Sequence, residues 1–364
     1  MSRPRTAAVI ATFDQESFIR EAVLSVADQV DEVIVIDDCS RDATWEVLSA
    51  LRHPRIRASK NAVNLGVSQT FNVAVRAAEA EIILIQGGDD ISLPHRAHEQ
   101  VDVLADPLVS LVFSRPEVIN SAAQAAPDWL VPEFFPAASQ VPHVARLLFD
   151  SNYICAPSVA MRRNHYLELG GFHPALDLVQ DYELWLKATE VGEIVEIEHP
   201  VVRYRKHAAN LSRDYVGVDG PKHRRLRAEQ DFVRGSFIEG ATTQTLDRLA
   251  TGIGLDMARF QTLTRAERIV MIFLTHPDPL MKRRGTAGLI ALAGKGDYRE
   301  SFARVGLHPT DLARLMFDAD HDNMNQVTRA LQAGAAGAVS SPPPAARRSV
   351  LAAARTHLGR LLRR

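Results

Sequence analysis

The chain has 364 residues, and its 42 lysines and arginines against 44 aspartates and glutamates give a formal net charge of −2. This balance argues against a nucleic-acid binder that depends on bulk positive charge. Hydrophobic residues make up 46% of the chain and charged residues 24%, as in folded soluble domains, which excludes the disordered and collagen-like classes. The length suggests one large domain with an appendage, or two domains.

The cysteines and the apolar runs indicate the compartment. Cys39 and Cys155 form no CxxC pair, which favours a reducing compartment, and we expect both to be small buried side chains. The first apolar run, residues 7–11, is too short for the core of a signal peptide, and no run approaches the roughly 20 residues of a membrane span. We therefore expect a cytoplasmic protein that at most lies on a membrane surface.

Strand and helix patterns alternate over the first hundred-odd residues, which is typical of βαβ units and a mainly parallel sheet. The strands that these patterns predict are residues 7–11, 32–37, 55–59, 81–86 and 108–113. The helices predicted between them are residues 19–27, 42–51, 68–78 and 95–104. Ser40 or Asp42 is available as the N-cap of the second helix.

The rest of the chain follows a different pattern. Residues 115–142 have no periodicity and are interpreted as an insertion that crosses the site, and regular structure resumes near Asn152. A helix is predicted at about residues 181–191 and strands at 194–197 and 201–205, and the pattern is largely helical from Lys222. The expected domains are residues 1–215, a helical domain at 216–339, a proline-rich linker at 340–346 and a basic tail at 347–364.

Two adjacent pairs of aspartates, Asp37-Asp38 and Asp89-Asp90, stand at the carboxyl ends of predicted strands, where open α/β sheets bind ligands. Paired carboxylates beside a glycine-rich turn can hold a divalent cation that neutralises nucleotide phosphates. A separate carboxylate such as Asp181 can then act as a base. The alternative for any single aspartate is an N-cap or turn residue, and this alternative is weaker for adjacent like charges.

Four segments in chain order resemble the nucleotide-binding half of family-2 glycosyltransferases: Ala11-Thr12-Phe13-Asp14, residues 35–44, Asn64-Leu65-Gly66, and Gly88-Asp89-Asp90-Ile91 with Pro94. Downstream, Gly170-Gly171-Phe172 and residues 180–185 resemble the acceptor-side motif of that family, and residues 203–207 resemble its closing strand. The resemblance covers about residues 5–212. It implies a GT-A fold, with a Rossmann-like, mainly parallel sheet and flanking helices, followed here by a C-terminal helical region. It also implies inversion at the anomeric centre of a nucleotide-activated sugar.

The resemblance assigns roles to individual residues. Thr12 and Phe13 would line the base pocket, and Asp38 would contact the uracil or ribose with Asp37 beside it. The donor-binding set that it implies is Thr12, Phe13, Asp37, Asp38, Asn64, Gly66, Gly88, Asp89 and Asp90. Asp89 would bind Mg²⁺ or Mn²⁺, with His207 completing the metal site, and Asp181 would be the general base.

The chain departs from the family pattern in three places. Asp14 replaces the common asparagine, which is expected to affect only hydrogen bonding in its loop. The usual Asp-x-Asp-Asp is Gly87-Gly88-Asp89-Asp90 here, so the first acid is missing. The usual Glu-Asp pair is Gln180-Asp181, so Asp181 need not have a raised pKa.

Five side chains also have a reading from their own pattern. Trp185 is expected to pack in the core, with stacking on a sugar as the second alternative, while Arg203, Arg205 and Lys206 could meet a phosphate or form a solvated strand face. A lone histidine such as His207 is more often a surface or packing residue than a metal ligand.

We predict an inverting glycosyltransferase that moves a sugar from a nucleotide-diphosphate donor, with UDP favoured, to a glycan, lipid-linked or other hydroxyl acceptor. Cell-envelope or surface polysaccharide synthesis would suit it, and no nucleic-acid partner is expected. The alternative is a catalytically silent nucleotide-sugar-binding or scaffold protein, because Gly87 and Gly88 replace part of the metal motif. A dinucleotide-dependent oxidoreductase is disfavoured because no GxGxxG follows the first strand.

The tail at residues 347–364 interleaves arginines with apolar residues and contains no acid. This pattern predicts either a basic amphipathic helix in peripheral contact with an anionic membrane, or a solvated or disordered tail.

Overall fold

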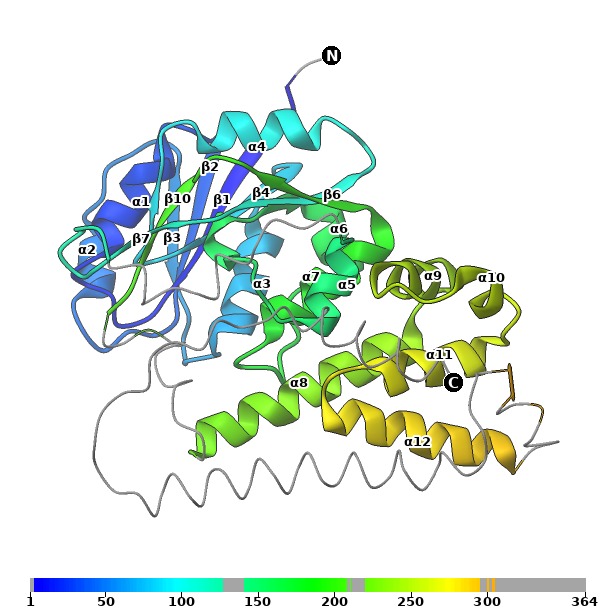
Figure 1. Cartoon of the computed structure of the whole chain (residues 1–364). Helices are drawn as coiled ribbons and strands as arrows, with labels where there is room; N and C mark the ends of the chain where they lie inside the picture. The colour runs from blue at the N-terminus through cyan, green and yellow to red at the C-terminus, as the bar shows by residue number, and fades with distance from the viewer. Residues whose placement is uncertain are drawn as a thin grey trace. The chain divides into compact units, whose positions relative to one another are not determined.

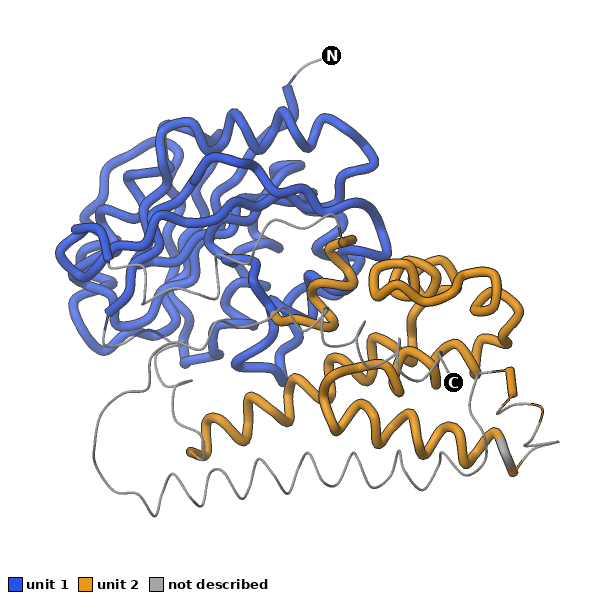
Figure 2. The backbone as a smooth tube through the Cα atoms, in the orientation of Figure 1, with its two compact units in different colours: residues 1–138, 152–216 blue, residues 139–151, 217–364 orange. Residues whose placement is uncertain are grey.

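The computed structural model describes residues 3–126, 141–207, 210, 220–294, 300, 303 and 304. The chain divides into two compact units, one of residues 1–138 and 152–216 and the other of residues 139–151 and 217–364 (Figure 2). The sequence pattern did not predict that residues 139–151 join the second unit. The predicted linker at 340–346 and the basic tail at 347–364 lie outside the described residues.

The first unit is built on a seven-stranded sheet with the order β3-β2-β1-β4-β8-β6-β9 (Figure 1). The strands are β1 (Thr6–Thr12), β2 (Glu32–Asp37), β3 (Ile56–Lys60), β4 (Ile82–Gly87), β6 (Val109–Ser114), β8 (Ala160–Arg162) and β9 (Glu193–Ile197). The β3-β2-β1-β4 and β6-β9 neighbours are parallel, and β8 is antiparallel to both of its neighbours. The sheet confirms the predicted α/β class and its mainly parallel arrangement.

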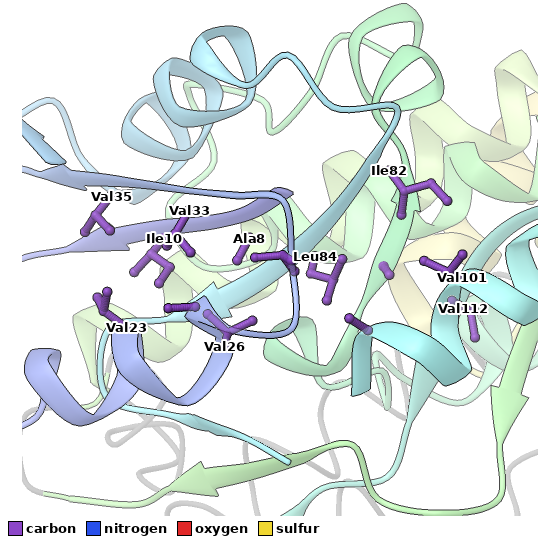
Figure 3. Packing of buried hydrophobic residues seen from close by; sticks show 14 of the residues in the cluster. Ala8, Ile10, Val23, Val26, Val33, Val35, Ile82, Leu84, Val101 and Val112 are labelled. Carbon is purple, nitrogen blue, oxygen red and sulfur yellow. The ribbon is translucent and has the colours of Figure 1, made fainter. Parts of the chain in front are cut away.

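The central strands are apolar on both faces, because helices cover both sides of the sheet. On one face, alternate residues of β1, β2 and β4 pack against α1 (Ile19–Ala27) and α4 (Arg96–Leu104) (Figure 3). On the other face lie α3 (Val67–Ala77), which contacts β1 and β2, and α7 (Gln180–Val191), which contacts β6 and β9. The bounds of these four helices differ from the predicted ones by one residue at most.

The remaining helices of this unit are short. They are α2 (Thr44–Ser49), the 3₁₀ turn η3 (Ala156–Ser158) and α6 (Arg163–Glu168). Ala43 rather than Ser40 or Asp42 holds the N-cap position of α2. Asp42 instead accepts a hydrogen bond from the backbone N–H of Thr44 at 2.9 Å, so it is a turn residue.

A second, three-stranded sheet lies at the end of the first unit and has the order β5-β10-β7 (Figure 1). Its strands are β5 (Ile91–Ser92), β7 (Glu117–Ile119) and β10 (Val202–Arg205). The antiparallel pairing of β10 with β5 sets Arg203 opposite Ile91. This register brings the chain around residue 205 beside the Asp89-Asp90 pair.

The second unit is helical in its described part, as the pattern after Lys222 predicts. Its helices are α5 (His143–Phe149), α8 (Pro221–Gly240), α9 (Thr243–Gly252), α10 (Met257–Phe260), α11 (Arg265–Thr275) and α12 (Pro279–Ala293). The side chains of Thr242, Thr264 and Asp278 cap the starts of α9, α11 and α12. Across the described residues, no helix has the length and apolarity needed to cross a bilayer.

The short helix α5 was not predicted. Its two turns offer too little periodicity to separate it from the irregular stretch before it. In the structure, the buried His276 packs on the ring of Phe149 at 4.9 Å, and its Nε2 lies 2.9 Å from the carbonyl of Leu148. Burial, followed by the charge of Arg234, lowers the pKa of His276 to about 3, so the imidazole is neutral and has a packing role.

Candidate active site

The carboxyl ends of three neighbouring strands meet at one edge of the sheet. The register places Thr12 of β1 opposite Asp37 of β2, and Ala11 opposite Gly87 of β4. Both predicted acidic pairs therefore stand at the same sheet edge, which is the ligand-binding edge of an open α/β sheet.

Asp37 and Asp38 lie inside this edge, and their carboxylates are engaged by the protein. Asp37 is fully buried, accepts a hydrogen bond from the backbone N–H of Ser40 at 3.1 Å, and forms an ion pair with Lys60 at 3.3 Å. The carboxylate of Asp38 accepts backbone N–H groups of Leu65 and Gly66, each at 2.8 Å. Asp38 thus fastens the 61–66 turn to the end of β2.

Asn64 and Gly66 take part in the same turn. The side-chain Nδ2 of Asn64 donates to the carbonyl oxygen of Asp38 at 3.1 Å. Gly66 has a φ of +81°, a left-handed conformation that glycine adopts without strain, and it stands at the N-cap position of α3. These two residues shape the loop at the start of α3.

The first loop after β1 carries Thr12 and Phe13. Thr12 is buried, and its hydroxyl donates to Oε1 of Gln15 at 2.7 Å. The side chain of Phe13 remains 36% exposed, and the guanidinium carbon of Arg41 lies 5.1 Å from the ring centroid. Phe13 therefore offers an aromatic surface at the sheet edge.

The two glycines of the Gly87-Gly88 turn are closely surrounded. A Cβ on Gly87 would lie 2.8 Å from Oδ1 of Asp89 and still closer to a carboxylate oxygen of Asp90. A Cβ on Gly88 would lie 2.8 Å from the hydroxyl oxygen of Thr12. Both distances are too short for a real Cβ contact. The glycines thus let the carboxylates of Asp89 and Asp90 lie close to the end of β4.

Asp89 contacts the second sheet through its side chain. His207 Nε2 lies 2.8 Å from Oδ2 of Asp89, and the same oxygen accepts a hydrogen bond from Nδ2 of Asn210 at 3.2 Å. The side chains of His207 and Asp89 retain 9% and 12% exposure. Phe18 packs against the His207 ring with the centroids 4.8 Å apart, which fixes the orientation of the imidazole.

Asp90 differs from its neighbour in environment. It is 1% exposed, and its Oδ1 accepts the backbone N–H of Arg205 at 2.8 Å. Burial, followed by the charge of Asp89, raises the pKa of Asp90 well above its usual range. Asp90 therefore supports the turn from inside, while Asp89 keeps an edge toward solvent.

Arg205 does not have the role that the sequence suggested for it. Its side chain is 2% exposed, and its guanidinium donates to the carbonyl of Asp89 and to the carboxylate of Glu21, both at 2.8 Å. Further donors bind the carbonyls of Asn120 and Ser121. Because these donors are used within the protein, Arg205 organises the Asp89 loop and is not available to a phosphate. Arg203 forms an ion pair with Glu117 at 2.9 Å.

The protein donors for a divalent cation are few. Within the described residues, no three His, Cys, Asp or Glu side chains gather in an arrangement that could hold a metal ion. Asp89 and His207 provide one carboxylate oxygen and one imidazole nitrogen that converge at 2.8 Å. This pair fits a cation that takes most of its ligands from bound phosphate and water, as Mg²⁺ and Mn²⁺ commonly do.

The loop before α7 is fixed by the helix that begins at the Asp38 turn. Asn72 of α3 accepts the backbone N–H of Phe172 at 3.0 Å and donates to the Phe172 carbonyl at 2.7 Å. Ser68 of the same helix donates to the carbonyl of Leu176 at 2.8 Å. The loop before α7 and the Asp38 turn are thus both anchored on α3.

Asp181 stands in the first turn of α7 and is half-buried. The backbone N–H of Tyr182 donates to its Oδ1 at 2.7 Å, and Nδ2 of Asn152 donates to its Oδ2 at 3.2 Å. Burial raises the pKa of Asp181 to about 6, and the two hydrogen bonds oppose this rise. The prediction that its pKa need not be raised is wrong, because burial rather than a charged neighbour controls it.

Three further predictions concern packing. Trp185 is fully buried and meets Phe172 edge-on at 6.1 Å, which confirms core packing. Cys155 is buried as expected, whereas Cys39 is only half-buried because it turns the chain at the end of β2 with a φ of +64°. Burial, then the charges of Asp90 and Asp181, raise the pKa of the Cys155 thiol.

The sequence did not single out Asn152, Asn210 or Asn61 as site residues. Asn61 donates to the Asp38 carboxylate at 2.8 Å, and the other two contact Asp181 and Asp89. Each contact joins segments at least 23 residues apart, so no local pattern reports it.

Comparison with known proteins shows which family the first unit resembles. Residues 7–170 match the family described as Glycosyl transferase family 2. An uncharacterized glycosyltransferase of Methanocaldococcus jannaschii is 26% identical over 195 residues, which cover 51% of this chain and 65% of that protein. The Escherichia coli protein named UDP-Glc:alpha-D-GlcNAc-diphosphoundecaprenol beta-1,3-glucosyltransferase WfaP is 24% identical over 208 residues, 56% of this chain and 78% of that protein. The chain spans between 34% and 65% of the length of the first four curated relatives it matches.

A solved structure shows the same fold. The crystal structure of S. aureus TarS 1-349 in complex with UDP aligns over 80% of this chain and 93% of that chain, with a TM-score of 0.53 and 16% identity. The mainly parallel sheet with flanking helices and the helical C-terminal region are thus a GT-A arrangement. Residues 7–170 therefore form a domain of the glycosyl transferase family 2 type.

Proposed function

We propose that this chain is an inverting glycosyltransferase that moves a sugar from a nucleotide-diphosphate donor to a hydroxyl acceptor. The observation that carries the proposal is that one helix, α3, connects the acidic sheet edge with the loop before Asp181. Asp37 and the Asp89-Asp90 turn stand at the ends of strands on either side of β1, and α3, which begins at the Asp38 turn, also anchors the loop before α7, where Asp181 stands. An acid pair at the ligand-binding edge and a separate carboxylate on α7 suit transfer between two bound substrates.

The donor nucleotide would lie along the ends of β1, β2 and β4. The ring of Phe13 offers an aromatic face for the base, and the turn fastened by Asp38 shapes the ribose side. Asp89 and His207 would hold a divalent cation at the diphosphate. When bound, such a cation stabilises negative charge on the leaving nucleotide.

Asp181 would act as the general base. Its pKa of about 6 leaves the carboxylate mainly ionised at neutral pH, while its partial burial keeps it basic enough to accept a proton. As an acceptor hydroxyl attacks the anomeric carbon, its proton passes to Asp181. The new glycosidic C–O bond forms while the C–O bond to the diphosphate breaks, and this single displacement inverts the anomeric centre.

UDP is the nucleotide that we propose. TarS 1-349 was crystallised with UDP, and WfaP carries a UDP-glucose donor in its name. The WfaP name also includes a diphosphoundecaprenol-linked acceptor, which supports a lipid-linked or envelope glycan as the acceptor class here. A cytoplasmic enzyme with membrane contact through residues 347–364 would suit that acceptor.

Calorimetric titration with UDP, GDP and dTDP, each with Mn²⁺ and again with EDTA, tests the donor site. Micromolar binding of UDP that EDTA abolishes would support the proposal. Binding unaffected by EDTA would overturn the metal at Asp89, and no binding to any nucleotide would overturn the donor site. The rival of a silent binding protein predicts UDP binding with no release of UDP from any UDP-sugar.

A further inference from the structure

We propose that Asn152 is a positioning residue that orients Asp181 through one amide atom and binds a second hydroxyl of the acceptor through the other. The acceptor group is therefore a sugar or polyol that presents two neighbouring hydroxyls, rather than an isolated alcohol. This inference rests on the proposed function, because it assigns the acceptor of the same site.

The first part of the argument is the polarity of the Asn152–Asp181 contact. Nδ2 of Asn152 lies 3.2 Å from Oδ2 of Asp181. An ionised carboxylate can only accept hydrogen bonds, so the NH₂ group of the amide must face Asp181. The amide carbonyl Oδ1 then points away from that carboxylate.

The second part concerns this carbonyl oxygen. Oδ1 of Asn152 is buried, and no described protein group donates a hydrogen bond to it. The Oε1 atom of Gln180, the residue before Asp181, is also buried and accepts no hydrogen bond from a described protein group. Unpaired buried acceptors are costly in folded proteins and are usually paired with a ligand or water where they persist. Two such acceptors therefore accompany the base.

The third part is the chemistry that fits. Both free atoms are acceptors, so the ligand must supply donors, and a sugar has a donor hydroxyl on each of several adjacent carbons. One hydroxyl gives its proton to Asp181 while its neighbour donates to Oδ1 of Asn152. A site built to pair with a hydroxyl discriminates strongly against a molecule that lacks it.

The segment that carries Asn152 is packed and hydrogen-bonded, which fixes the position of the Asn152 amide. The three residues that follow, Tyr153, Ile154 and Cys155, are all buried. The Cys155 carbonyl accepts hydrogen bonds from the backbone N–H and the hydroxyl of Ser158, at 2.9 and 2.8 Å. The amide is thus presented from a packed segment.

The variants Asn152→Ala and Asn152→Asp test the proposal, with Asn164→Asp, at an exposed position of α6, as the matched control. UDP release from UDP-glucose is measured with methyl β-D-glucopyranoside, its single-deoxy analogues and cyclohexanol as acceptors. We expect Asn152→Ala to lower kcat/KM for the glucoside by about 10- to 100-fold while the Kd for UDP is unchanged. With the wild type, kcat/KM for one of the deoxy analogues should be lower than for the glucoside by the same factor. With Asn152→Ala, kcat/KM for that analogue and for the glucoside should be equal.

A second readout needs no turnover. The titration of the Asp181 carboxyl carbon, followed by NMR, should move to higher pH in Asn152→Asp, because a donor is replaced by a second carboxyl group while the shape is kept. The other titratable group shown to interact with Asp181 is the Cys155 thiol, which its raised pKa keeps neutral.

The outcomes separate the two proposals. Unchanged acceptor kcat/KM in Asn152→Ala, equal use of cyclohexanol and the glucoside, or an unmoved Asp181 titration in Asn152→Asp would each overturn the role of Asn152. Failure of the wild type to bind UDP or to release it from any UDP-sugar would instead overturn the proposed function.

Discussion

His207 Nε2 lies 2.8 Å from Oδ2 of Asp89, although 118 residues separate them in the chain. Two structural features produce this contact. The antiparallel pairing of β10 with β5 returns the chain to the end of the acidic turn, and Phe18 packs against the imidazole ring. The contact joins the second acidic pair to the segment that follows β10.

Replacing His207 tests whether this pair holds a cation. We expect His207→Ala to weaken UDP binding in Mn²⁺ by about 10-fold or more, because an imidazole ligand is lost. UDP binding in EDTA should not change further. Calorimetry on the variant measures both values, and His98→Ala, at an exposed histidine, is the control. Equal affinities for wild type and His207→Ala in Mn²⁺ would contradict the assignment.

Gly87→Ala tests the close packing of the acidic turn. The added methyl group would meet the carboxylates of Asp89 and Asp90, so they must move. We expect a loss of about 1–3 kcal/mol in the free energy of unfolding, together with weaker UDP binding in Mn²⁺. Gly240→Ala is the control, because a Cβ there meets no atom within 4 Å. A Gly87→Ala protein as stable as the wild type would show that the turn has room.

The pH dependence of turnover should report Asp181. Only the ionised carboxylate can accept the acceptor's proton, so kcat/KM should fall about tenfold per pH unit below its pKa of about 6. Initial rates of UDP release between pH 4.5 and 9 measure this limb, with UDP binding at each pH as the control. An acidic midpoint near the ordinary aspartate value of 3.8 would contradict the effect of burial.

The same carboxylate should cost stability at neutral pH. The pKa of Asp181 is about 6 in the folded protein against 3.8 for an ordinary aspartate, so the folded state binds the proton more tightly. Stability from this group is therefore present below about pH 4 and lost as the pH rises to about 6. Asp181→Asn removes the charge and should gain at most about 3 kcal/mol above pH 7 relative to its effect at pH 4. Urea unfolding at both pH values measures the difference, and a constant difference would contradict the raised pKa.

Much of the fold follows from local pattern. β1, β2 and β4 are continuous apolar runs, and their placement at the ends of short βα units makes their carboxyl ends coincide. That pattern was enough to place Asp37 and Asp89 at one edge. It was also enough to assign Trp185 to the core.

The burial and the contacts of each side chain could not be predicted from local sequence pattern. Asp38 and Asp89 look equivalent in sequence, yet Asp38 fastens a turn with its carboxylate while Asp89 keeps an edge toward solvent. From the sequence, Arg205 could have met a phosphate or lain on a solvated strand face. In the structure its guanidinium donates hydrogen bonds to the Asp89 carbonyl and the Glu21 carboxylate. The pKa of Asp181 depends on burial and on Asn152, and both come from contacts between distant segments.

Whether the chain is a glycosyltransferase with Asp181 as its base is tested most directly by UDP release. The rates of the wild type and Asp181→Asn are compared with UDP-glucose as donor and a panel of sugar acceptors. We expect acceptor-dependent release by the wild type, a loss of at least about 100-fold in Asp181→Asn, and the same UDP affinity in both proteins. Equal rates in the two proteins would contradict Asp181 as the base. UDP binding without release by the wild type would identify a binding protein instead of an enzyme.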